Sequence, residues 1–345
     1  MRGTSYIHRR GQVVGACLLL AALSVAALFL CCAVGSARVA PSDLLETALA
    51  KLRGAPAPNP TAELILFGIR LPRALLSYAV GAALAVSGAL MQGVFRNPMA
   101  EPGLLGVSSG AALGAAVAMV LNLQLSALGF SAVSLSAFAG GTLAVLLVLG
   151  ISRAGRESAT VLLLSGVAVS AFLSAVIAGL LALNHDKMDT VYLWTMGSFA
   201  SASFPKLRPV AAATALGLAA SLCVARDLNA LSADADARTL GVNAPVVRLF
   251  ALGVATLLTA AAVSVSGVIG FVGLMAPHAV RSLTGADHRS LLPLSALAGG
   301  LFLLAADTLA RTLFMPAELP VGAMTSLFGG PFFLLLIRRA REGRR

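Results

Sequence analysis

The chain has 345 residues, of which 58% are hydrophobic and 11% charged, and it carries a net charge of +11. Soluble domains hold about 25% charged residues, so this composition excludes an ordinary soluble protein and predicts an all-α polytopic membrane protein. The basic residues stand at the ends of apolar runs and form no separate basic domain, so the net charge does not indicate a nucleic-acid partner.

Apolar runs recur along the whole sequence. A helix needs about 20 apolar residues to cross the hydrocarbon core of a bilayer, and these runs supply about ten such helices. We expect them to form a single transmembrane domain covering residues 1–345. The first run is longer than the roughly 7–15 apolar residues of a signal peptide, so we expect it to be retained. The predicted spans are 13–34, 74–94, 103–121, 127–150, 160–183, 206–224, 246–265, 268–284, 291–310 and 322–337.

The distribution of lysine and arginine predicts the orientation, because cytoplasmic loops carry an excess of these residues. If the N-terminus is inside, most of the 25 lysine and arginine residues fall on the inner side. We therefore expect an even number of spans and both termini in the cytoplasm.

Three connections are longer than turns. We expect outer segments at 35–73, with the Pro-rich stretch "APAPNP", and at 184–205, which holds the only tryptophan. The third connection, 225–245, lies on the inner side, and apolar residues recur in it at helical spacing, which predicts short amphipathic helices. Their apolar side consists of Leu228, Leu231, Ala235 and Leu240.

A polar, helix-breaking stretch, "QGVFRNPMAEPGLLG" (92–106), lies between the second and third spans. Asn97-Pro98 is expected to end one helix and Pro102-Gly103 to begin the next. Irregular backbone at membrane depth persists only where protein or a water-filled cavity satisfies its polar groups. The stretch is therefore either a tight structural turn or part of a pathway.

No arrangement of residues indicates an enzyme, a cofactor or a metal site. The four histidines are scattered without metal-ligand spacing, and none of the three lysines follows a glycine, as a P-loop requires. Few ionisable residues lie inside the predicted spans, which argues against a stand-alone secondary transporter. Asp307 stands four residues before Arg311 on one predicted helix, so we expect a local ion pair between them.

Short motifs occur in order along nearly the whole chain: "RLPR" (70–73), "GAALAVSGALMQGVFRNPMAEPGLLGVSSGAALG" (81–114), "LLLSGVAVSA" (162–171), "WTMGSF" (194–199), "ARTLGVN" (237–243), "GVIGFVGLMAPHAVR" (267–281), "ADHR" (286–289), "DTLAR" (307–311), "ELPVG" (318–322) and "GGPFF" (329–333). With these motifs the chain resembles the permease subunits of type II ABC importers, which take up iron–siderophore complexes, haem and cobalamin.

The resemblance implies ten spans per subunit and a location in the bacterial cytoplasmic (inner) membrane. It also implies four kinds of partner: a second permease subunit, two cytoplasmic ATPases that bind ATP and magnesium, an extracytoplasmic substrate-binding protein, and membrane lipid. The chain itself is expected to bind no cofactor. The segment "GSFASASFPKL" (197–207) favours a ferric siderophore as the cargo, with haem and cobalamin as alternatives.

The resemblance also implies roles for individual residues. A gate at the inner mouth of the pathway maps to Asn97, Pro98 and Met99, with a second constriction at Ala159 and Thr160. Contact with the ATPases maps to the inner segment at Ala237, Leu240 and Gly241. Docking of the binding protein maps to three arginines that the predicted topology places on the outer side: Arg70, Arg73 and Arg311.

Overall fold

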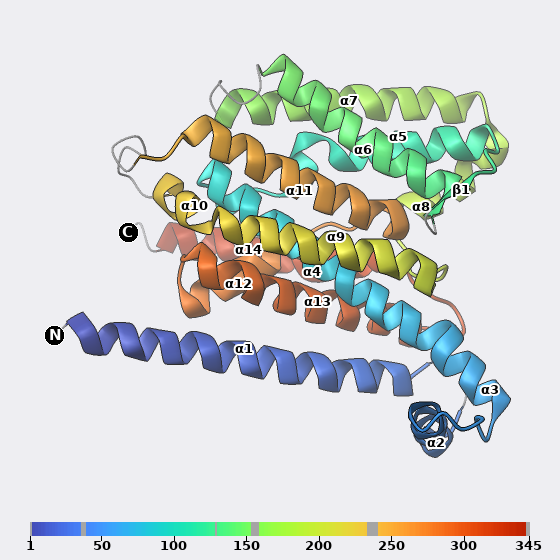
Figure 1. Ribbon diagram of the computed structural model, residues 1–345. Coiled ribbons are helices and arrows are strands. Elements are labelled where there is room, and N and C mark those ends of the chain that lie inside the picture. The colour runs from blue at the N-terminus through green and yellow to red at the C-terminus, as the bar shows by residue number, and fades with distance from the viewer. Residues whose placement is uncertain (1, 36–38, 128–129, 153–158, 233–240, 343–345) are drawn as a thin grey trace.

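The computed structural model describes residues 2–35, 39–127, 130–152, 159–232 and 241–342 (Figure 1). In this part of the chain, ten helices of 13 residues or more run side by side along one direction. Each of them overlaps one of the predicted spans. They are α1 (Arg2–Ala33), α4 (Leu71–Phe95), α5 (Val107–Val120), α6 (Ala132–Ile151), α7 (Ala159–Ala182), α9 (Phe204–Cys223), α11 (Ala244–Ser266), α12 (Val272–Thr284), α13 (His288–Thr312) and α14 (Val321–Glu342).

Short elements join these helices at both ends of the bundle. They are α2 (Pro41–Leu52), α3 (Pro60–Glu63), the π-helical η1 (Leu64–Arg70), the 3₁₀ turns η2 (Pro102–Leu105) and η4 (His185–Lys187), α8 (Met188–Thr195), α10 (Ala225–Ser232), and the two-residue strands β1 (Ser126–Ala127) and β2 (Phe130–Ser131). The two strands pair antiparallel, with Ser126 opposite Ser131.

The helices differ in whether they could cross a membrane alone. Among the described residues, six are long and apolar enough to do so, and the pair α9 and α10, bent by 58°, makes a possible seventh. Two of the remaining predicted spans fall on the shorter apolar helices at Val107–Val120 and Val321–Leu336. The third falls on α12, which has 13 residues. The short helices α5 and α12 each follow a stretch of irregular backbone, so the regular helical structure of the bundle is interrupted before them.

The centre of the bundle is α4, which packs against α9, α11, α12 and α13 (Figure 1). Glycines allow this close approach, because a side chain at the crossing points would collide with the neighbouring backbone. A Cβ added at Gly88 would lie 1.8 Å from the carbonyl oxygen of Gly273 on α12, and one added at Gly81 would lie 2.3 Å from that of Gly299 on α13. The two edges of the bundle, α1 and α7, are mostly exposed.

The two ends of the bundle correspond to the two predicted sides. The first residues of α1 and the last of α14 lie at the same end as α10, whereas α2 and α8 lie at the opposite end (Figure 1). The start of α1 and the end of α14 therefore lie at one end of the bundle, and the cytoplasmic location of both termini stays a prediction. The expected break near 266–267 is confirmed, since α11 ends at Ser266 and Gly267 adopts a positive φ of 71°.

The first part of the inner segment is helical, as its spacing predicts. Leu228 and Leu231 on α10 are fully buried, so the apolar side of this amphipathic helix packs against the bundle. Ala235 lies outside the described residues, and so does Leu240.

Candidate functional site

The inner loop, residues 96–106, connects α4 to α5 with irregular backbone. Arg96 ends α4 in the left-handed region, with φ 49°. Asn97 then forms a turn, because its Oδ1 accepts a hydrogen bond from the N–H of Met99 at 2.9 Å. Asn97 and Pro98 are exposed and Met99 is half-buried. The residues expected to form a gate therefore lie together on the inner end of the bundle.

A carboxylate links the inner loop to the break between α11 and α12. Glu101 Oε1 accepts a hydrogen bond from the backbone N–H of Phe271 at 3.0 Å. Phe271 precedes α12 with φ 68°, so its N–H points away from the helix toward the loop. Burial raises the pKa of the Glu101 carboxyl above its ordinary value, and the Phe271 N–H opposes this shift. The sequence reasoning assigned no role to Glu101.

Buried polar contacts hold the inner end of α4 to α12. Gln92 is 1% exposed. Its Nε2 donates to the carbonyl oxygen of Gly273 at 3.3 Å, and its Oε1 accepts from Arg281 Nη2 at 3.3 Å. Two contacts therefore hold this region: Gln92 joins the end of α4 to α12, and Glu101 joins the inner loop to the residue that precedes α12.

The second expected constriction lies at the start of α7. Ala159 and Thr160 are the first residues of that helix, and Thr160 is exposed. The contact between α7 and the inner loop falls farther along the helix, where a Cβ at Gly166 would lie 2.1 Å from the carbonyl oxygen of Leu104. A constriction at the start of α7 stays a prediction.

The residues expected to contact ATPases are only partly described. Ala237 and Leu240 lie outside the described residues. Gly241 is exposed and has a φ of 74°, and among the described residues no atom lies within 4 Å of an added Cβ. Its backbone conformation, rather than a close contact, accounts for the glycine at this position.

The three outer arginines are all buried within this chain. Arg70 is 4% exposed, and Arg73 and Arg311 are each 8% exposed. Arg70 Nη1 donates to the carbonyl oxygens of Cys32 and Ala33 at 2.9 and 3.0 Å. Arg311 Nη2 donates to that of Cys31, and its Nε is buried without a hydrogen-bond partner.

These two arginines cap α1. The last carbonyl groups of a helix have no partner within it, and basic side chains are favoured there. Arg70 comes from the end of η1 and Arg311 from the end of α13, so together they fix the outer end of α1 to the rest of the bundle.

Arg73 joins two acidic residues from other parts of the chain. Its Nη2 lies 2.9 Å from Asp307 Oδ1, and its Nη1 lies 2.9 Å from Glu318 Oε2. The side chains of Arg73 and Asp307 are 9% and 2% exposed, whereas that of Glu318 is 40% exposed. The expected local pair between Asp307 and Arg311 is therefore wrong. The packing of α4 against α13 brings Arg73 to this carboxylate instead.

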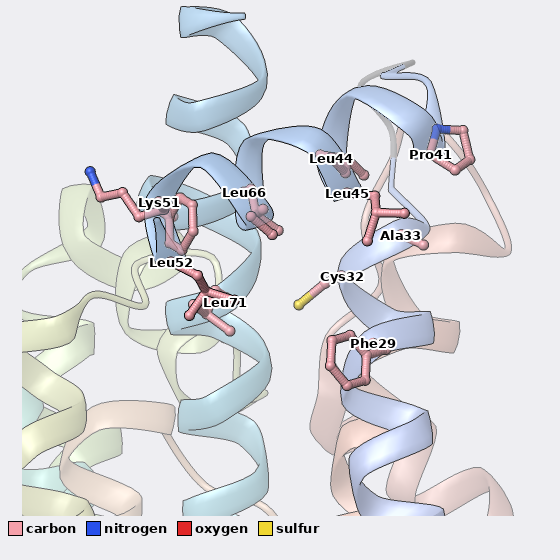
Figure 2. Close-up of a pocket in the computed structure, with 12 residues that line it drawn as sticks. Phe29, Cys32, Ala33, Pro41, Leu44, Leu45, Lys51, Leu52, Leu66 and Leu71 are labelled. Atoms are coloured by element: carbon pink, nitrogen blue, oxygen red, sulfur yellow. The ribbon is translucent and has the colours of Figure 1, made fainter. Parts of the chain in front are cut away.

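An apolar cavity of about 420 Å³ lies beside this cluster, between the outer ends of α1 and α4 and under α2 (Figure 2). Its wall includes Phe29, Leu44 and Leu66. Lys51 is its one charged lining residue, and that side chain forms an ion pair with Glu63 at 2.5 Å. The cavity therefore offers little to orient a polar cargo.

The arrangement defines a class of protein: a multi-pass helical membrane protein with an irregular inner loop between its spans. The chain belongs to the FecCD transport family, which it matches over residues 20–339. It is a permease subunit of an ABC importer, and its fold is that of the type II importer permeases. As such it is a transport subunit.

Named relatives span several cargoes. The chain is 45% identical over 283 residues to the hemin transport system permease protein HmuU of Yersinia pestis, covering 81% of this chain and 85% of that one. It is 46% identical to the cobalamin import system permease protein BtuC of Halobacterium salinarum, covering 81% and 74%. It is 40% identical to the Fe(3+) dicitrate transport system permease protein FecD of Escherichia coli, covering 80% and 86%.

A solved structure has the same fold. It is an inward-facing conformation of a metal-chelate type ABC transporter, with a TM-score of 0.81 and 32% identity, and the match covers 94% of this chain and 98% of that one.

Proposed function

We propose that the chain carries an iron complex, a ferric siderophore, across the bacterial cytoplasmic membrane, with both termini in the cytoplasm. It works with a second permease subunit, two cytoplasmic ATPases that bind ATP and magnesium, and an extracytoplasmic binding protein. The observation that carries the transport role is the inner loop, which is irregular, partly exposed, and bonded through Glu101 to the residue that precedes α12.

The inner loop acts as the gate. Asn97, Pro98 and Met99 close the inner mouth of the pathway, with Ala159 and Thr160 forming a second constriction. Breaking the Glu101–Phe271 hydrogen bond frees the loop from α12 without unfolding either flanking helix, because the bond is made by one side chain in a connection.

ATP hydrolysis reaches the chain through the inner segment 225–245. Ala237, Leu240 and Gly241 contact the ATPases, and α10 carries the movement into the bundle. The proposal is supported by the position of α10, which lies at the end of the bundle that holds the inner loop and packs against α4.

The binding protein docks on the outer end of the bundle, where Arg70, Arg73 and Arg311 meet. Opposite charges at such interfaces orient docking and raise the association rate. Since these arginines bind acceptors inside the chain, a carboxylate of the binding protein has to share or replace one of those acceptors. Docking would then loosen the cap on α1.

Haem is the second candidate cargo, and cobalamin the third. The hemin and cobalamin permeases named above are 45% and 46% identical to the chain, whereas the siderophore assignment depends on the segment 197–207. A strain lacking the chain decides among them. We expect it to lose growth on a ferric siderophore as the single iron source and to retain growth on haem. The reverse pattern would assign haem, and a defect confined to cobalamin-dependent growth would assign cobalamin.

A further inference from the structure

A group of polar side chains at the inner end of the bundle joins α10 to α13, with the carboxamide of Asn229 at its centre. Asn229 Oδ1 accepts a hydrogen bond from the backbone N–H of His288 at 2.9 Å, and its Nδ2 donates to Asp287 Oδ1 at 2.7 Å. Asp287 also caps α13 by accepting from the N–H of Arg289 at 3.0 Å. Asn229 thus holds the first turn of α13 from a different helix.

The imidazole of His288 fills the space between Asn229 and α4. Its Nδ1 lies 2.7 Å from Asn229 Oδ1. A carboxamide oxygen can only accept, so Nδ1 carries a hydrogen, and in the neutral ring Nε2 is then unprotonated. Nε2 is buried with no hydrogen-bond partner among the described residues, and a Cβ added at Gly93 would lie 2.6 Å from it. The ring is fully buried, and its hydrogen bond to Asn229 fixes its position against the α4 backbone.

The same point of α4 is reached from α10 by a second contact. Ser232, the last residue of α10, donates from its Oγ to the carbonyl oxygen of Gly93 at 3.4 Å. The neighbouring Gln92 is bonded to α12 through Gly273 and Arg281. The inner loop begins directly after this turn of α4. One continuous set of contacts therefore runs from α10 to the end of α4, where the inner loop begins.

We propose that Asn229 and His288 are positioning residues that transmit movement of the inner segment to the inner loop. This inference rests on the proposed function, in which the segment 225–245 contacts the ATPases. Leu228 and Leu231 bury one side of α10, Asn229 links it to α13, and His288 meets α4. Because these contacts are continuous, a displacement of α10 is passed through Asn229 and His288 to α4.

The test uses the complex of the chain with its ATPases, reconstituted in nanodiscs. Met99→Cys reports on the inner loop through its rate of labelling by a charged maleimide, measured with and without ATP and vanadate. The parent for all variants carries Cys17→Ala and Cys223→Ser, because these two thiols are not buried. Cys31 and Cys32 stay in place, since both are buried.

We expect Asn229→Ala to remain bound to the ATPases and to lose the effect of nucleotide on labelling, a change of about fivefold or more in the ratio of the two rates. His288→Asn can supply an amide donor where Nδ1 stood and should retain the effect. His288→Leu, which packs but cannot donate, should lose it. A role in packing alone would predict the opposite order for the two His288 variants.

Two results would overturn the inference. A parent-like nucleotide effect in both Asn229→Ala and His288→Leu would overturn it and leave the proposed function standing. A parent complex that binds ATPases but shows no nucleotide effect would overturn the gate proposal together with this inference. If Asn229→Ala fails to assemble with the ATPases, the two His288 variants decide: a nucleotide effect on labelling in His288→Asn but not in His288→Leu supports the inference, and the opposite order overturns it.

Discussion

The carboxylate of Glu101 accepts a hydrogen bond from the backbone N–H of Phe271 across 170 residues of sequence. The bond joins the inner loop to residues 267–271, the irregular stretch between α11 and α12. Both partners lie in connections rather than within helices, so the bond fixes how the loop sits against the bundle. If the inner loop is the gate, as proposed above, its movement has to change this contact.

The Glu101 carboxyl should make stability depend on pH. Its pKa is raised in the folded protein above the ordinary value of 4.5. The folded state therefore binds the proton more tightly than the unfolded state, so this contribution to stability is present below the ordinary pKa and is lost as the pH rises through the folded one. Glu101→Gln keeps an acceptor for Phe271 N–H without the buried charge. We expect it to raise the unfolding temperature in detergent relative to the parent at neutral pH, and to match the parent near pH 4.

The matched control for that experiment is Glu101→Ala. It removes the acceptor and leaves the N–H of Phe271 unpaired, which costs about 1–3 kcal/mol if the site stays buried. We expect a lower unfolding temperature than that of Glu101→Gln at every pH. Equal unfolding temperatures for the two variants would show that the hydrogen bond to Phe271 contributes nothing.

The buried pair between Arg73 and Asp307 should be far more important for stability than the partly exposed pair between Arg73 and Glu318. Removing one partner of a buried pair leaves an uncompensated charge and costs about 3–5 kcal/mol, whereas an exposed pair contributes about 0–1 kcal/mol. We expect Asp307→Ala to lower the unfolding temperature strongly and Glu318→Gln to change it little. Thermal unfolding of the purified variants in one detergent measures both, and similar shifts would contradict the assignment.

The cap on α1 predicts where hydrogen exchange should change. Arg70→Gln and Arg311→Gln each remove a charged donor from the carbonyl groups of Cys31, Cys32 and Ala33. We expect faster exchange at the outer end of α1 and unchanged exchange in α13. Lys51→Gln serves as the control, because it removes an exposed basic residue from the same end of the bundle. Unchanged exchange in α1 in both arginine variants would contradict the capping role.

Gly241 offers a test of the contact with the ATPases. Its φ of 74° is available to glycine and, at a smaller cost than for other residues, to asparagine. We expect Gly241→Asn to retain most ATPase binding and Gly241→Arg to lose it, since a long charged side chain would stand where the ATPase surface approaches. Co-purification of the ATPases with each variant is the measurement. Full ATPase binding by Gly241→Arg would show that Gly241 does not lie at the interface with the ATPases.

The sequence is sufficient to predict the ten long helices of this fold, because long apolar runs and their breaks report on single helices. The break after Ser266 and the buried side of α10 at Leu228 and Leu231 follow from local pattern alone. The partners of buried polar groups could not be predicted in this way. Asp307 pairs with Arg73, which is 234 residues away in the sequence, because the packing of helices decides which side chains meet. The four-residue spacing of Asp307 and Arg311 along one helix led to the wrong partner.

The candidate site likewise has a part that could be predicted from the sequence and a part that could not. The inner loop stands out in the sequence through its prolines and charges, so its existence and position could be predicted. The bonds that hold it could not, because Glu101 and Phe271 belong to different motifs and neither has a periodic pattern that pairs them. His288 lies in the motif "ADHR" (286–289), but only the structure places its ring between Asn229 and α4.

The central claim is that the chain is a passive pathway whose driving force comes from ATPases. Uptake into liposomes of a radioiron-labelled ferric siderophore, haem and labelled cobalamin, each supplied on its binding protein, tests it most directly. The account predicts that the chain with its ATPases accumulates one of these cargoes only with internal ATP and magnesium, and that the chain alone accumulates none. Concentration of a cargo by the chain alone, driven by a proton or sodium gradient, would contradict it.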